Sequence, residues 1–238
     1  MIYISEKRII IMQFKDFIKS LNSDTAEENI IKNIFLSLLT SMILLGVLYF
    51  LRFRDVPGLV SEYGFFLFLA TLSYSLILLP ARYVRSYKEF PCMSGMMIGM
   101  TIGMISGFLP GFFIGATNGM FWGSIFGMTM GMSFGVVNGK CCGVMGTLEG
   151  SMAGFMGGLM GAMTAIMMIN DNVKFAGVII FMVSGGILFG LNYMIYNETR
   201  EMKKEVSDGD FFTIFWSFIL TAITAGFMIF GPRSVLFQ

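Results

Sequence analysis

The sequence of 238 residues contains no histidine and only three cysteines, Cys92, Cys141 and Cys142. Without histidine, His-ligated haem, the common zinc sites and histidine general bases are excluded. An odd number of cysteines, two of them adjacent, does not form a disulfide framework, so we expect thiols that face a reducing compartment. No nucleophile can be paired with a histidine base, and we therefore expect that the protein is not an enzyme.

Charged residues are also scarce, since they make up 13% of the chain, against about a quarter in soluble globular domains. The 16 Lys and Arg nearly balance the 15 Asp and Glu, which leaves no basic excess to bind the phosphates of a nucleic acid. Hydrophobic residues reach 55%, and the mean hydropathy is +0.76. The composition predicts a membrane protein whose main partner is the lipid bilayer, and it excludes nucleic acid as a partner.

Seven stretches are apolar enough and long enough to cross a hydrocarbon core of about 30 Å. They cover residues 34–51, 64–81, 93–116, 120–137, 142–169, 175–196 and 211–231. The predicted fold class is an all-α polytopic membrane protein with about seven transmembrane helices. The dipeptides Asn118-Gly119 and Asn138-Gly139 predict short turns that join the third, fourth and fifth of these helices.

The chain divides into three predicted regions. Residues 1–33 form an N-terminal segment with an amphipathic helix, which lies on the membrane surface or packs on the protein itself. Residues 34–231 form the transmembrane domain. Residues 232–238 end in Leu-Phe-Gln, which resembles the remnant of a protease-cleaved purification tag, and they are set aside.

Basic residues predict the orientation, because they accumulate on the cytoplasmic side of membrane proteins. Four of them fall on one side of the predicted topology, namely Arg52, Arg54, Lys174 and Arg233. Twelve fall on the other side, namely Lys7, Arg8, Lys15, Lys19, Lys32, Arg82, Arg85, Lys88, Lys140, Arg200, Lys203 and Lys204. We therefore expect a plasma-membrane protein with a cytoplasmic N-terminus.

Glycine recurs at every fourth position from Gly95 to Gly143, and the repeat resumes from Gly146 to Gly158. Residues four apart form a ridge on a helix, so a row of glycines replaces that ridge with a groove that another backbone can enter. The repeat predicts a glycine-zipper and methionine-rich core of three helices over residues 92–169, with the other helices as a lipid-facing shell. The core either surrounds a narrow path or is packed without one. The grooves would also let a second copy of the chain associate.

Sixteen of the 23 methionines lie between Met93 and Met168. On the third and fifth predicted helices they form stripes about 100° and about 80° wide. Thioethers are soft, uncharged ligands that select Cu(I) among biological metals, although methionine also fills apolar interfaces without any ligand. The candidate metal ligands on the two helices are Cys92, Met93, Met96, Met100, Met104, Cys141, Cys142, Met145, Glu149, Met152, Met156, Met160 and Met163.

The thiols and the carboxylate have distinct expected roles in this set. The cysteines lie at the predicted cytoplasmic ends of their helices, where Lys140 would favour the thiolate form that binds metal. Glu149 lies inside the fifth helix, where a carboxylate is costly and indicates a functional site. It would neutralise a passing cation or exchange a proton, or it is a carboxyl that ties helices together by hydrogen bonds.

The segment Met100–Met104 (Met-Thr-Ile-Gly-Met) and the flanking glycines resemble the MxxxM and GxxxG motifs of the eukaryotic Ctr-type copper transporters. That resemblance implies thioethers in a pore and small residues for helix packing. It covers a few residues, and that family has three helices per subunit where this chain predicts about seven.

Two functions are compatible with these patterns. The first is a membrane permease or channel for a soft metal cation, above all Cu(I), with the cysteines as the cytoplasmic hand-off. Cu(I) would then be the transported ion, and no tightly bound cofactor is expected. The second is a non-transporting membrane scaffold or assembly protein whose glycine grooves pack its own helices or a partner.

Overall fold

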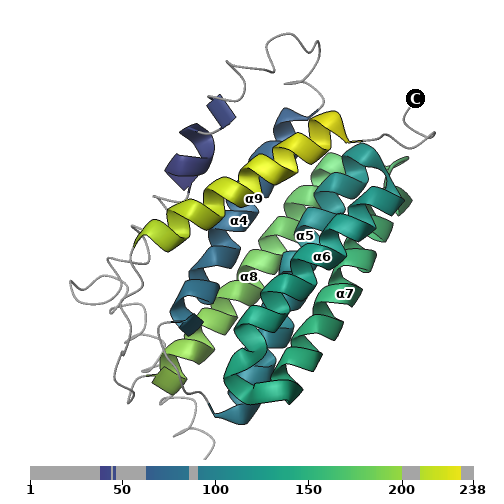
Figure 1. Cartoon of the computed structure of the whole chain (residues 1–238). Helices are drawn as coiled ribbons and strands as arrows, with labels where there is room; N and C mark the ends of the chain where they lie inside the picture. The colour runs from purple at the N-terminus through teal and green to yellow at the C-terminus, as the bar shows by residue number, and fades with distance from the viewer. Residues whose placement is uncertain (1–37, 44, 47–62, 86–90, 200–209, 232–238) are drawn as a thin grey trace, which may run out of the picture.

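The computed structural model describes residues 38–43, 45–46, 63–85, 91–199 and 210–231, and these ranges contain helices and turns but no strand (Figure 1). The helices are α4 Gly64–Arg85, α5 Cys92–Asn118, α6 Met120–Gly139, α7 Gly143–Met167, α8 Val173–Thr199 and α9 Asp210–Phe230, with a short 3-10 turn, η2, at Lys140–Cys142. The second to seventh predicted spans each correspond to one of the six long helices. Their ends differ from the prediction by a few residues.

Five of these helices, α4 to α8, are long and apolar enough to cross a membrane, and α9 contains a shorter apolar stretch, Phe215–Ile229. The prediction of an all-helical membrane protein is therefore confirmed for the described ranges. The first predicted span, 34–51, is described only at residues 38–43 and 45–46. The segment 1–33 with its amphipathic helix and the terminal residues 232–238 lie outside the described residues.

Glycines with positive φ make the two turns between α5, α6 and α7. Gly119 has φ 103° and separates α5 from α6, and Gly143 has φ 67° and begins α7. Side chains other than glycine rarely adopt such angles. Asn138 still belongs to α6, so the second turn begins later than the predicted Asn138-Gly139 dipeptide and passes through η2. The two turns make α5 and α7 run parallel, with α6 antiparallel to both.

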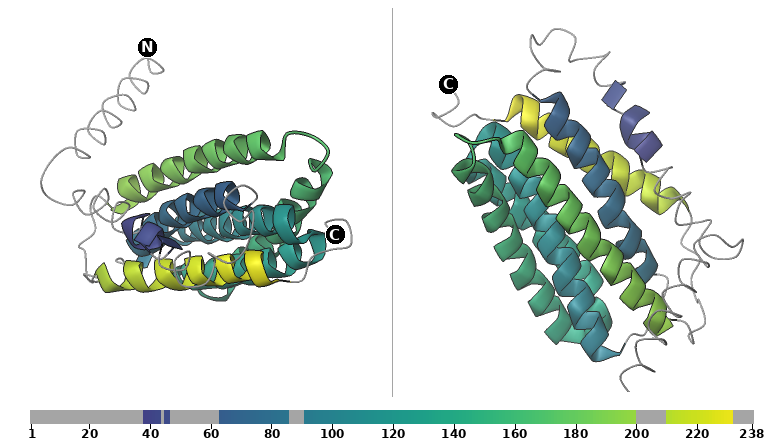
Figure 2. Two further views of the ribbon diagram at one scale, coloured as in Figure 1. Left: turned by 90° about the horizontal axis from the view of Figure 1, so that it is seen from above. Right: turned by 180° about the vertical axis from the view of Figure 1, so that it is seen from behind.

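Helix α5 lies at the centre of the bundle, and this corrects the prediction that α5, α6 and α7 are central together. The most apolar windows of α5 and α4 are 72% and 67% buried, whereas those of α6 and α7 are only 33% and 39% buried. Figures 1 and 2 show α7 at one edge of the bundle and α9 toward the other. Helices α5, α6 and α7 therefore form one side of the molecule. Helix α5 also packs against the helices of the other side.

On the glycine-rich side, backbones meet with almost no side chains between them. A Cβ atom placed on Gly103 would lie 2.6 Å from the carbonyl oxygen of Gly150. A Cβ atom on Gly127 would lie 2.8 Å from the carbonyl oxygen of Gly107 and 2.8 Å from the Cα atom of Gly158. Real Cβ contacts essentially never come closer than 3.0 Å, so any larger residue at these positions requires the helices to move apart.

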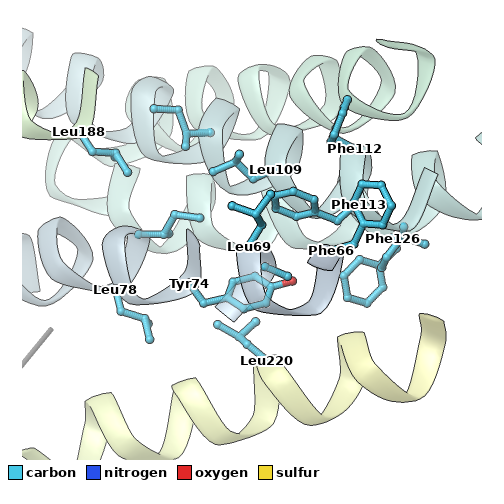
Figure 3. Packing of buried hydrophobic residues seen from close by; sticks show 14 of the residues in the cluster. Phe66, Leu69, Tyr74, Leu78, Leu109, Phe112, Phe113, Phe126, Leu188 and Leu220 are labelled. Carbon is cyan, nitrogen blue, oxygen red and sulfur yellow. The ribbon is translucent and has the colours of Figure 1, made fainter. Parts of the chain in front are cut away.

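On the other side of α5, large side chains fill the space between helices. Phe112 and Phe113 of α5 are fully buried, and they belong to one apolar cluster with Leu69 of α4 and Leu188 of α8 (Figure 3). The phenyl rings of Phe112 and Phe113 meet edge to face with centroids 5.8 Å apart, which is a favoured aromatic geometry. Helix α5 thus contacts α6 and α7 through backbone atoms, and it contacts α4 and α8 through large side chains.

Buried polar side chains fasten α9 to its neighbours. The Ser41 and Ser217 hydroxyl oxygens lie 2.7 Å apart between the helical residues 38–43 and α9. The amide Nδ2 of Asn118, at the end of α5, donates to the carbonyl oxygen of Phe227 at 3.0 Å. Such hydrogen bonds contribute to helix association in a membrane.

Candidate metal-binding face

Helices α5 and α7 touch along a line that we call the α5–α7 seam, defined by two backbone contacts. A Cβ atom on Gly157 would meet the backbone of Met104, and one on Gly161 would meet the backbone of Phe108. A second row of α7 packs on α6, where glycines of α5 also meet it, and it consists of Gly146, Gly150, Gly154 and Gly158. Successive residues of a helix are rotated by 100°. The methionine stripe of α7 therefore lies beside Gly157 and Gly161, on the side away from the row that packs on α6.

The methionine side chains beside the seam are exposed on the outside of the bundle. On α7 the exposed fractions range from 45% for Met163 to 68% for Met167, and on α5 from 43% for Met104 to 80% for Met93. Met96 is half-buried. The other exposed candidate ligands have exposed fractions within these ranges, and they are Met100, Met145, Met152, Met156 and Met160. Met97 shares the exposed face of α5 and was not among the candidate ligands, although its helical position already placed it in the stripe.

The structure therefore corrects the idea of a thioether-lined path inside the three glycine-rich helices of a single chain. The space where α5, α6 and α7 meet is occupied by glycine backbones, as the contacts of Gly107 with Gly154 and Gly158 show. Hydropathy treats lipid and a neighbouring helix alike, so the sequence did not indicate which way the thioethers face. A path along these side chains would run on the outer surface of the chain.

Two of the three cysteines come together where α5 and η2 meet. The Cys142 thiol donates to the carbonyl oxygen of Cys92 at 2.9 Å. Cys92 is exposed and Cys142 is half-buried, whereas the side chain of Cys141 lies outside the described residues. The exposed Lys140 occupies the same turn. Two cysteines, one from α5 and one from η2, thus lie at one end of the seam.

Glu149 is half-buried on α7 at the edge of the methionine stripe. In the second of its two expected roles, its carboxyl ties helices through Asn118, Asn138 or Ser and Thr hydroxyls. Those amides donate elsewhere, to the carbonyl oxygens of Phe227 and Phe134. Within the described part of the chain, Glu149 makes no side-chain hydrogen bond or ion pair. An unpartnered carboxylate in an apolar helix is costly and marks a candidate functional site.

Thioethers dominate the donor set of this face. Among the residues that the structure describes, no group of three or more Cys, Asp or Glu side chains gathers at one point. The described donors near the seam are one carboxylate, two thiols and many thioethers. This set matches a soft monovalent cation better than Mg²⁺ or Ca²⁺, which prefer several oxygen ligands.

The helices and the face that they present define the class of the molecule as a multi-pass α-helical membrane protein. No protein-family model, curated protein or solved structure matches the chain.

Thiol labelling tests the predicted orientation of this face. Because Cys92 is exposed at the start of α5, a chain with Cys141→Ser and Cys142→Ser should react with a membrane-impermeant maleimide in inverted vesicles and not in sealed cells. Asp171 follows α7 and lies at the opposite end of the helices. Asp171→Cys in a cysteine-free chain should therefore show the reverse pattern. Labelling of Cys92 from outside sealed cells would contradict the orientation.

Proposed function

We propose that this protein is a membrane permease or channel for soft monovalent metal cations, with Cu(I) as the chemically best-matched ion. The observation that carries the proposal is that the parallel α5 and α7 place their methionine stripes on one exposed face, which leads away from the Cys92 and Cys142 sulfurs. Thioethers bind Cu(I) without adding charge to the membrane interior. The thiols at the end of the seam serve as the hand-off site.

A cation on this face needs ligands on more than one side, because bare hydrocarbon solvates charge poorly. We propose that a second copy of the chain supplies them, so that the methionine face of each copy closes the path. The glycine-packed half supports this arrangement as a rigid platform, since its helices contact one another through backbone atoms. The transported ion then passes between copies, along the seams.

A scaffold function remains the second candidate, and the same exposed face favours it. Methionine is flexible and polarisable and suits adaptable association surfaces. In that function α5 and α7 would bind a partner helix through Met100, Met156 and their neighbours, with no metal ligation.

Binding and uptake of Ag(I) and Cu(I) by the purified chain in liposomes separate the two candidates. We expect saturable binding and uptake of both ions, with no uptake of K⁺ or Mg²⁺, because thioethers do not select hard cations. Circular dichroism on the same sample verifies that the helices are intact. An intact protein that binds neither soft ion would refute the permease and leave the scaffold ahead.

A further inference from the structure

The position of Glu149 relative to α5 follows from three contacts of α5 with η2 and α7. Gly103 meets Gly150, Cys92 meets Cys142, and Met104 meets Gly157, so the paired residue numbers differ by 47, 50 and 53. A residue of α7 therefore lies level with a residue of α5 about 50 positions earlier. For Glu149 this level is that of Gly99 (149 − 50), which lies between Met96 and Met100.

The helical rows place Glu149 near the same segment of α5. Glu149 precedes Gly157 by eight residues, which are two steps along an i, i+4 row. Met104 contacts Gly157, and the residue eight positions before Met104 on α5 is Met96. Glu149 therefore begins the row of α7 residues, spaced four apart, that continues with Ala153, Gly157 and Gly161. It is the one charged residue of that row.

Further thioethers surround Glu149 on its own helix. Met145 and Met152 lie four residues before it and three residues after it, and residues at these spacings are neighbours on a helix surface. Both are more than half exposed. The carboxyl group therefore has thioethers on both sides along α7 and, across the seam, at the level of Met96 and Met100.

We infer that Glu149 is the anionic ligand of a charge-neutral binding site for one soft monovalent cation in the α5–α7 seam. Met96 and Met100 supply thioethers from α5, and Met145 and Met152 supply them from α7. This inference rests on the proposed function for the class of ion. A carboxylate and a monovalent cation are each costly in an apolar environment, and their pairing removes the net charge.

The local charges support this assignment. Between Pro91 and Ile169 the sequence contains only two charged residues, Lys140 and Glu149. Lys140 belongs to η2, nine residues before Glu149 and outside α7. The seam therefore offers one negative charge among neutral sulfur ligands, which is one charge equivalent for Cu(I) or Ag(I).

Titration calorimetry with Ag(I) on the full chain in nanodiscs tests the site. We expect Glu149→Gln to weaken the tightest Ag(I) binding event by at least about tenfold, or ~1.4 kcal/mol. The double variant Met96→Leu, Met100→Leu should weaken it similarly, since leucine keeps the volume and removes the sulfur. Met182→Leu is the matched control, because Met182 is exposed and belongs to α8, which is not a helix of the seam, and it should bind as the wild type does.

A second substitution separates the charge of Glu149 from its packing. Glu149→Cys supplies a soft thiolate at the same position and should retain tight Ag(I) binding that Glu149→Gln loses. Tight binding by a folded Glu149→Gln variant would overturn the inference and leave the permease intact if uptake continues. Glu149-dependent binding without any uptake would support the site and refute the permease. A wild-type chain that binds no Ag(I) would overturn both.

Discussion

Replacing Gly154 by leucine is expected to abolish the folded bundle, which is the largest stability effect of any single change that we predict. A Cβ atom at Gly154 would meet the backbone of Gly131 and Met132 on α6. These atoms belong to a helix and cannot rotate aside, so α6 and α7 must separate along their length. Even Gly154→Ala should cost about 3 kcal/mol, at the upper end of the range for overpacked cores.

The matched control is Gly190 on α8, which has no heavy atom within 4 Å of a placed Cβ. Gly190→Ala should leave stability unchanged or raise it by up to about 1 kcal/mol through helix propensity. Unfolding of both variants in mixed micelles, followed by circular dichroism during a titration with sodium dodecyl sulfate, gives the comparison. Equal tolerance at both positions would mean that the glycine contacts do not hold the helices together.

The largest expected functional effect comes from removing the thioethers of α7. A chain with Met152, Met156, Met160 and Met163 all changed to leucine should lose uptake of Ag(I) and Cu(I) by about two orders of magnitude, because leucine offers no soft donor. The fold should survive, since methionine and leucine exchange at a cost usually below about 1.5 kcal/mol per site. These side chains are exposed, which lowers that cost further.

The control for this variant exchanges methionines of α8, Met182→Leu and Met194→Leu, because α8 is not a helix of the seam. Flux of radioactive silver into liposomes measures both chains at equal protein density. If the fourfold α7 variant is folded and still transports the ions at the rate of the control, its thioethers serve packing or partner association. The scaffold function would then explain the methionine face better than transport does.

The sequence contained enough information to locate the helices. Runs of apolar residues placed α5 near 93–116 and α8 near 175–196, and the structure extends these to Cys92–Asn118 and Val173–Thr199. The glycine repeat also predicted which backbones approach one another closely. Both signals are local or strictly periodic, so they need no knowledge of which helix neighbours which.

The arrangement around α5 was not predictable in the same way. Leu69 and Phe112 are as hydrophobic as any lipid-facing residue, so hydropathy cannot show that α4 and α5 are the most buried helices. The direction of the methionine stripe, with Met156 facing outward, depends on which α7 row meets α5. The hydrogen bond between Ser41 and Ser217 joins residues 176 positions apart, and neither serine has a local signal for it.

The two unlike faces of α5 have a consequence for biosynthesis. Its glycine face finds partners as soon as α6 and α7 leave the ribosome, because those helices follow it directly in the chain. Its face with Phe112 and Phe113 also contacts α4, which is made earlier, but α8 and α9 are made last. The chain can therefore assemble in the order in which it is inserted, with the backbone-packed half complete before α8 and α9 close over the aromatic residues.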